Sequence, residues 1–206
     1  MKTIANWIRF NLFYLGKPAW DTGVSPPELT NFLESASPGK ALDVGCGTGT
    51  NLVTLASFDW QVVGVDLAWL SVLKARAKLR QMGCEGQVRY GDVTGSLELD
   101  ESFDLVLDIG CYHSLTSQKR DIYRQRLNSW LNTGGTYLLY AHRQAEPGDS
   151  HGINDIDLDS FSQFLNLDWR QDSPELRPDG AGGRPATWAR FTRLHQKEAK
   201  PGIFLL

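Results

Sequence analysis

The stretch that decides the fold is ALDVGCGTGTN at residues 41–51, where a short apolar run meets three closely spaced glycines. The apolar run is typical of a buried strand, and a helical pattern begins at Thr50. Gly45, Gly47 and Gly49 can adopt backbone angles that other residues avoid, and they let the chain approach a ligand closely. The stretch therefore predicts a ligand-binding turn between a strand and a helix.

The pattern of a strand followed by a helix continues after this turn, where short apolar runs alternate with longer stretches of helical periodicity. Short, mostly apolar strands joined by helices are typical of a parallel sheet that is covered on both faces. The pattern predicts an α/β fold with a doubly wound, Rossmann-like sheet. We expect strands at residues 41–44, 61–66, 88–90, 103–108 and 135–141, and helices at residues 50–58, 69–82 and 118–132.

After residue 143 the pattern changes to a short helix near residues 158–165 and apolar runs at residues 167–171 and 187–194. Two runs without a helix between them can pair as a hairpin, so one of them must run antiparallel to the sheet. The sequence therefore predicts seven strands, mostly parallel, with one antiparallel strand near the C-terminus and helices on both faces of the sheet.

Apolar residues on one stripe also predict an N-terminal helix at residues 4–15, followed by an irregular connection that contains several prolines. We expect a single domain over residues 1–206. Its parts are an N-terminal helical lid at residues 1–38, a cofactor-binding core at residues 39–143, and a C-terminal helix and hairpin at residues 144–206.

The composition argues against several classes of protein. The 206 residues carry a formal net charge of −3, whereas a general nucleic-acid binder is usually basic. No run is apolar enough over its length to span a bilayer, and the three cysteines lack paired spacing, which is typical of reduced thiols. We expect a soluble cytoplasmic protein with no nucleic-acid, membrane or metal partner, and make no prediction of its oligomeric state.

The spacing of the glycines argues against two common classes of ligand, dinucleotides and nucleoside triphosphates. A dinucleotide fingerprint has its third glycine three positions after the second, where this chain has Thr50, and the Gly-Lys-Ser/Thr ending of a P-loop is absent. Asp43 would repel a phosphate and suits a ligand that carries an amino group. A nicotinamide-dependent oxidoreductase remains an alternative, because the strand, the glycine turn and Asp66 also fit that fold.

Two further acids follow the next predicted strands. Asp66 ends the run at residues 61–66, where a carboxylate can accept both hydroxyls of a ribose. Asp92 follows the run at residues 88–90, where a carboxylate can accept the exocyclic amine of adenine. Each acid alone is well explained as a helix cap or a loop residue. Three acids in order at successive strand ends nevertheless favour a nucleoside ligand.

These residues resemble a known family, the class I S-adenosylmethionine-dependent methyltransferases. The resemblance lies in LDVGCGTG at residues 42–49, VD at 65–66, GDV at 91–93 and FDLVLD at 103–108. It implies S-adenosyl-L-methionine as the cofactor, with the glycines at its methionine part, one acid at the ribose and another at the adenine. The cofactor-binding residues that it implies are Trp20, Asp43, Gly45, Cys46, Gly47, Gly49, Asn51, Asp66, Leu67, Asp92, Val93, Asp108 and Ile109.

A second resemblance concerns the methyl acceptor. PAWDTG at residues 18–23 with PPEL at residues 26–29 is similar to the entry segment of the thiopurine and tellurite-resistance branch, which methylates small soft acceptors. Residues 108–113 lack the Asn/Asp-Pro-Pro-aromatic turn of enzymes that methylate base amines. The implied function is methyl transfer to a small thiol, chalcogen or similar nucleophile; a non-catalytic binding module is the alternative. The expected acceptor contacts are Asp21, Cys111, Tyr112, His113 and His142.

A general base is required only for some acceptors. Methyl transfer from a sulfonium is an in-line displacement that depends mainly on proximity and orientation, and a soft acceptor needs little help from a base. For harder acceptors, His113 and Asp108 are the expected catalytic residues, with His142 and His151 as further candidates. His113 is preferred because it follows the fourth strand and because imidazole titrates near neutral pH. A structural contact explains its position equally well.

Overall fold

The computed structural model describes residues 10–146, 149, 151–176 and 182–195. The described chain forms two compact units, and the boundary between them lies between Asp100 and Glu101. Residues 4–9 of the helix predicted at residues 4–15 lie outside the described residues, and residues 10–13 are helical. Among the helices that the structure describes, none has the length and apolar character that a bilayer-spanning segment requires.

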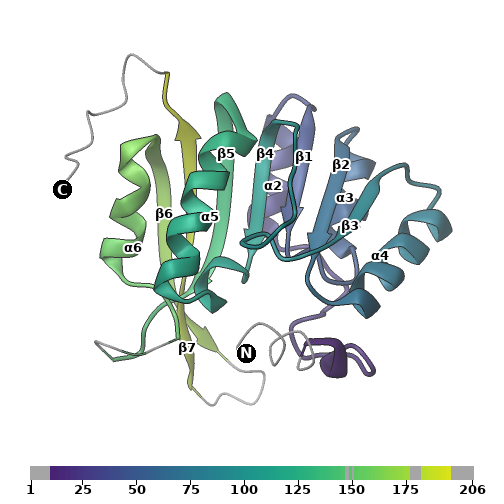
Figure 1. Ribbon diagram of the computed structural model, residues 1–206, viewed down its shortest axis with the longest axis horizontal. Coiled ribbons are helices and arrows are strands. Elements are labelled where there is room, and N and C mark those ends of the chain that lie inside the picture. The colour runs from purple at the N-terminus through teal and green to yellow at the C-terminus, as the bar shows by residue number, and fades with distance from the viewer. Residues whose placement is uncertain (1–9, 147–148, 150, 177–181, 196–206) are drawn as a thin grey trace. The chain divides into compact units, whose positions relative to one another are not determined.

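The first unit contains a three-stranded parallel sheet in the order β3-β2-β1 (Figure 1). Its strands are β1 (Lys40–Val44), β2 (Gln61–Asp66) and β3 (Gln87–Tyr90), which confirms the three predicted positions. The centres of β1 and β2 are buried, as expected for a parallel sheet with both faces covered. Because the strands are parallel, their carboxyl ends meet at one edge.

Besides the helical residues 10–13, the described part of this unit contains α2 (Pro27–Ser35), α3 (Thr50–Ser57) and α4 (Trp69–Gln81). α3 packs on β1 and β2, and α4 packs on β2 and β3. The sequence predicted α3 and α4, but the expectation of an irregular connection through Pro27 was wrong. Proline is favoured at the first helical position, where its missing N–H has no intrahelical partner to lose. The helix that starts there buries Leu29 and Leu33.

The second unit contains a four-stranded sheet in the order β4-β5-β7-β6. β4 (Phe103–Ile109) and β5 (Leu131–His142) are parallel, whereas β7 (Gly182–Arg193) runs antiparallel to both β5 and β6 (Leu165–Leu176). The predicted hairpin and the single antiparallel strand are therefore confirmed. With the three strands of the first unit, the described chain has the seven mostly parallel strands that the sequence predicts.

The helical elements of the second unit are η1 (Tyr112–Ser114), α5 (Ser117–Trp130), α6 (Asp155–Asp159) and η2 (Ser160–Gln163). Figure 1 shows α5 across one face of the β4-β5 pair. Several predicted boundaries were wrong, and β6 and β7 are each longer than the apolar runs at residues 167–171 and 187–194 that predicted them. β5 begins at Leu131 because its first residues form a bulge against β4, and the helix expected near residues 158–165 starts earlier, where Asn154 and Asp157 form a capping box.

Candidate functional site

The glycine turn predicted from residues 41–51 joins β1 to α3. Gly45, Gly47 and Gly49 all have positive φ, at 73°, 54° and 81°, and Gly49 is the N-cap of α3. The backbone N–H groups of Gly45 and Cys46 donate to the Val65 carbonyl at 2.8 and 3.0 Å. The turn is therefore held against the end of β2 by its first two amides.

Space also restricts two of these positions to glycine. A Cβ atom on Gly47 would lie 3.1 Å from the Tyr14 hydroxyl oxygen, and one on Gly49 would lie 2.9 Å from the Cβ of Ala75 on α4. Tyr14 is buried, and burial together with the nearby charge of Asp66 raises the pKa of its hydroxyl, which therefore stays neutral. Sequence reasoning missed Tyr14, because it lies off the apolar stripe that predicted the N-terminal helix.

Asp66 lies at the end of β2, as the sequence predicts, and reaches back to the glycine turn. Its Oδ2 accepts from the Gly47 N–H at 2.9 Å, and its Oδ1 accepts from the Ala68 N–H at 2.7 Å. Burial raises the pKa of this carboxyl group, while the two backbone amides lower it. A hydrogen bond from the Ser71 side chain lowers the pKa as well, so protein donors surround this buried carboxylate.

Asp92 follows β3 and shapes its own loop. Its Oδ1 accepts from the backbone N–H of Thr94 at 2.8 Å and from the Thr94 hydroxyl at 2.7 Å. Val93 is buried beside it, whereas Asp92 itself is half-buried. The loop therefore places the Asp92 carboxylate next to the apolar Val93 side chain.

The segment at residues 14–25, which we call the entry segment, is attached to the glycine turn by side chains. The Thr48 hydroxyl lies 3.0 Å from both carboxylate oxygens of Asp21, and the Lys78 ammonium donates to the Thr48 and Thr50 hydroxyls at 3.1 and 2.8 Å. Sequence reasoning named Asp21 as an acceptor contact but missed Thr48 and Lys78. Neither belongs to a recognisable motif, and Lys78 comes from the last turn of α4.

The remaining predicted residues of this unit have mixed surroundings. The Asn51 side chain accepts from the Ser25 hydroxyl at 2.8 Å, so it also attaches the entry segment. Trp20 is 54% exposed, and its Nε1–H donates to the Tyr14 hydroxyl at 3.3 Å. Asp43 and Cys46 are buried, and burial raises the pKa of the Cys46 thiol, so Cys46 stays a neutral packing residue. Leu67 is half-buried.

In the second unit, Asp108 on β4 is wholly buried and organises the turn that follows. Its carboxylate accepts from the backbone N–H of Cys111 at 2.8 Å and of Tyr112 at 3.1 Å, and from the Tyr123 hydroxyl at 2.7 Å. Burial raises the pKa of Asp108 to about 6, although these hydrogen bonds act in the opposite direction. Ile109 and Cys111 beside it are half-buried.

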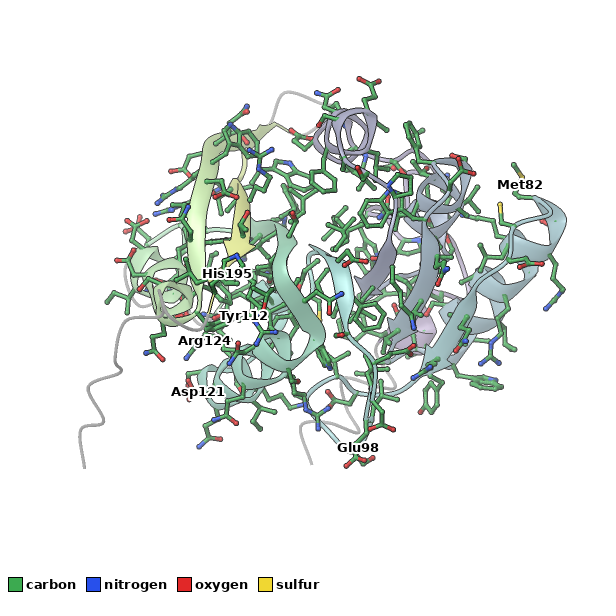
Figure 2. All side chains as sticks on the ribbon, turned by 90° about the horizontal axis from the view of Figure 1, so that it is seen from above. Met82, Glu98, Tyr112, Asp121, Arg124 and His195 are labelled. Carbon is green, nitrogen blue, oxygen red and sulfur yellow. The ribbon has the colours of Figure 1, made fainter. Side chains whose placement is uncertain are left out.

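Tyr112 is a core residue, which contradicts its expected contact with a methyl acceptor. Its side chain is fully buried and packs on Tyr123 and Phe161. Its hydroxyl accepts from Arg124 at 2.7 Å, and Arg124 also pairs with Asp121 (Figure 2). The sequence could not show this, because a short 3-10 turn gives no periodicity from which to assign the inward face.

Three histidines from separate segments converge in the second unit, and we call them the histidine cluster. His113 belongs to η1, His142 ends β5, and His151 lies in the following loop. The rings of His113 and His142 are stacked with centroids 4.4 Å apart, and His151 meets His113 edge-on at 5.0 Å. η1 and His142 both lie at the carboxyl ends of parallel strands, the edge at which α/β folds bind ligands.

A buried arginine assembles this cluster. Arg120 on α5 donates to the carbonyls of His113 and Gly152 at 3.2 and 2.7 Å and pairs with Asp157 at 2.8 Å. The backbone N–H of Ile153 donates to the His142 carbonyl at 2.9 Å, which brings the loop to the end of β5. His151 was named only as an isolated base candidate, because sequence spacing does not show this contact between loop and strand.

The chain is similar in sequence to known methyltransferases. Residues 41–135 match the family model described as a methyltransferase domain. A 2-heptyl-1-hydroxyquinolin-4(1H)-one methyltransferase from Mycobacteroides abscessus is 24% identical over 88% of this chain and 82% of its own length. A probable thiol methyltransferase 2 from Arabidopsis thaliana is 30% identical over 60% of this chain and 56% of its own.

The lengths of the relatives differ. A ribosomal RNA small subunit methyltransferase C from Alcanivorax borkumensis is 32% identical over 52% of this chain, but the match spans only 33% of that protein. An uncharacterized methyltransferase from Schizosaccharomyces pombe, C750.03c, is 30% identical over 50% of this chain and 70% of its own length.

Solved structures show the same fold. The N-methyltransferase NodS from Bradyrhizobium japonicum, in complex with S-adenosyl-L-homocysteine, matches with a TM-score of 0.75 at 17% identity over 92% of this chain and 98% of NodS. TehB from Haemophilus influenzae matches with a TM-score of 0.73 at 16% identity over 89% of this chain and 66% of TehB. Together with the sequence matches, these folds show that the chain belongs to the class I S-adenosylmethionine-dependent methyltransferases.

Proposed function

We propose that this protein transfers a methyl group from S-adenosylmethionine to a small molecule whose acceptor atom is a thiol sulfur or an acidic hydroxyl oxygen. Family membership supports the methyl transfer. The names of two relatives support the acceptor class, because one is a probable thiol methyltransferase and the other acts on a 1-hydroxyquinolinone. The observation that carries the proposal is the glycine turn with Asp66 bound to its backbone.

The residues of the first unit fit the cofactor chemically. Three glycines with positive φ leave the backbone of the turn uncovered by Cβ atoms. Asp66 lies beside the turn at the end of β2, and a carboxylate there can accept from the hydroxyl groups of a ribose. We therefore assign Gly45, Gly47 and Gly49 to the methionine part, Asp66 to the ribose, and Asp92 with Val93 to the adenine.

The chemistry divides between the cofactor and the chain. When bound, S-adenosylmethionine supplies an electrophilic methyl group on a positively charged sulfur. The chain binds and orients the partners, which is the main requirement of an in-line displacement. In this proposal, the entry segment covers the cofactor, with Trp20 and Asn51 among its contacts. Asp108 holds the turn that carries Ile109, Cys111 and His113.

Transfer of labelled methyl groups tests this function. The protein would be incubated with methyl-labelled S-adenosylmethionine and a panel of thiophenols, 1-hydroxyquinolin-4(1H)-ones, selenite, tellurite, phenols and RNA. We expect labelled small-molecule product with the first two groups and none in RNA. Cofactor binding without turnover over the whole panel would instead favour a binding module, and label in RNA alone would contradict a small acceptor.

A pair of variants makes this assay specific for the assigned site. Asp66→Ala removes the carboxylate that we assign to the ribose and should weaken cofactor binding in calorimetry by about tenfold or more. Asp100→Ala removes an exposed carboxylate from the same unit and serves as the matched control. Equal affinities in the two variants would contradict the assignment of Asp66.

A further inference from the structure

The protonation state of His113 follows from one backbone contact. The backbone N–H of His142 donates to the Nδ1 atom of His113 at 3.1 Å. An N–H group can only donate, so Nδ1 must offer a lone pair and cannot itself carry a proton. A neutral imidazole carries one proton, which in His113 must therefore be on Nε2.

The surroundings keep this ring neutral. Burial lowers the pKa of His113 to about 3, and the neighbouring His142, His151, Arg120 and Arg184 act in the same direction. Protonation at Nδ1 would also place an N–H group directly against the N–H group of His142. At neutral pH His113 is consequently an uncharged ring with a fixed donor, Nε2–H, and its lone pair is already occupied.

From this geometry we propose that His113 holds the methyl acceptor through an Nε2–H hydrogen bond instead of removing its proton. This role rests on the proposed function. Its ligand is an acceptor that enters already ionised, as a thiolate or as the anion of an acidic hydroxyl. Such an anion has several lone pairs, so one can accept the hydrogen bond while another attacks the methyl carbon. An acceptor that enters as an anion leaves no proton for the enzyme to remove.

The same contacts argue against a metal centre, although ligand atoms of the three histidines lie within 4.8 Å of one another. The planes of the His113 and His142 rings are only 7° from parallel, so the lone pairs in those planes do not converge on one point. A metal at Nε2 of His113 would also require the proton to move to Nδ1, where the His142 N–H donates. Hydrogen bonding is the role that fits the observed rings.

Two substitutions of His113 separate donor, base and structural roles. The amide nitrogen of Gln can occupy the place of Nε2 and donate, whereas the amide oxygen of Asn can occupy the place of Nδ1 and accept from His142. With a thiophenol as acceptor, His113→Ala and His113→Asn should each lose up to about 10²-fold in kcat/KM, because they lose a hydrogen bond to a bound anion, and His113→Gln should recover about tenfold of that loss. Cofactor affinity in calorimetry should stay within about threefold in all three variants.

Each other pattern contradicts the proposal. An equal loss in the Gln, Asn and Ala variants is the result expected of a general base, and higher activity in the Asn variant than in the Gln variant is the result expected of a structural contact. If all three variants were as active as the unsubstituted protein, His113 would have no role in binding the acceptor. Thermal unfolding of each variant verifies that it is folded before its rate is compared.

A measurement on the protein without cofactor keeps this inference separate from the proposed activity. Long-range proton–nitrogen NMR spectra of the nitrogen-15-labelled protein, with His113 identified by its absence in His113→Gln, should show a protonated Nε2 and an unprotonated Nδ1 between pH 6 and 8. The opposite tautomer, or a ring that titrates in this range, overturns the proposal. Saturable zinc binding that shifts all three histidines would also overturn it, in favour of a metal site.

Discussion

At the scale of single residues, conformation and available space act together. Gly47 has φ of 54° and a Tyr14 hydroxyl 3.1 Å from the position of an added Cβ, so a side chain there meets strain and a contact at once. Gly16 in the same unit has open space around the corresponding position. Gly47 is therefore a glycine by necessity, while the structure gives no such reason at Gly16.

Gly47→Ala tests this necessity. We expect a loss of about 1–2 kcal/mol in the free energy of unfolding, because a non-glycine residue is strained at this φ. Displacement of Tyr14 or of the turn should also weaken S-adenosylhomocysteine binding by about tenfold. Calorimetric titration and urea unfolding measure the two effects. Gly16→Ala is the control, and similar losses in both variants would contradict the spatial argument.

Asp108 makes a second prediction, about pH. Its folded-state pKa is about 6, above the ordinary value of 3.8, so the folded chain binds a proton more tightly than the unfolded chain. Its contribution to stability is therefore complete below pH 4 and is lost as the pH rises to 6, by about 3 kcal/mol. Asp108→Asn, whose amide oxygen can still accept from Cys111, should remove this component. Urea unfolding of both proteins at pH 4, 5, 6 and 7 measures how the free energy of unfolding depends on pH. The same pH dependence in both proteins would contradict the prediction.

At the scale of elements, side-chain hydrogen bonds fix segments that have little regular structure. Asp21, Thr48 and Lys78 connect the entry segment, the glycine turn and α4 through one hydroxyl group. The loop that carries His151 depends in the same way on Arg120 and on the backbone of β5. In both places, the position of an irregular segment is determined by partners that are distant in sequence.

Thr48→Val tests the first of these connections. Valine keeps the shape of threonine but removes the hydroxyl, so Asp21 and Lys78 each lose a charge-assisted hydrogen bond, and stability should fall by about 2 kcal/mol. Hydrogen exchange should become faster at residues 18–25 and stay unchanged in β1 and β2. Thr30→Val, whose hydroxyl donates to the Pro27 carbonyl in α2, is the control. Unchanged exchange at residues 18–25 would show that the hydroxyl does not hold the segment.

The elements also show what hydrophobic pattern and glycine spacing can predict. Both ends of strands β1 to β4 and of helices α3 and α4 were predicted within one residue, because buried parallel strands and the helices between them have strong periodic signals. α2 was missed because Pro26 and Pro27 were interpreted as breakers, although Pro27 begins the helix. The start of β5 was missed because a bulge against Phe103 is set by the neighbouring strand.

At the scale of the whole molecule, ligand binding and unfolding are linked. A ligand that binds only the folded chain raises the free energy of unfolding by about 2.7 kcal/mol when its concentration is 100 times its Kd. For a chain of this length, that corresponds to a rise of about 5–10 °C in Tm. We expect S-adenosylhomocysteine to produce this rise and NADH to produce none. A rise with NADH alone would contradict the cofactor and revive the nicotinamide-dependent alternative.

The sequence by itself determined the fold class, the cofactor class and the glycine turn between β1 and α3. These depend on local signals, namely apolar runs of strand length, glycines at fixed spacing and acids at strand ends. Only the tertiary structure decided the surroundings of individual side chains. It buried Tyr112 in the core, attached Asp21 to Thr48, brought His151 to His113, and set the tautomer of His113 through the His142 backbone. Such contacts join residues far apart in the chain, and no local pattern encodes them.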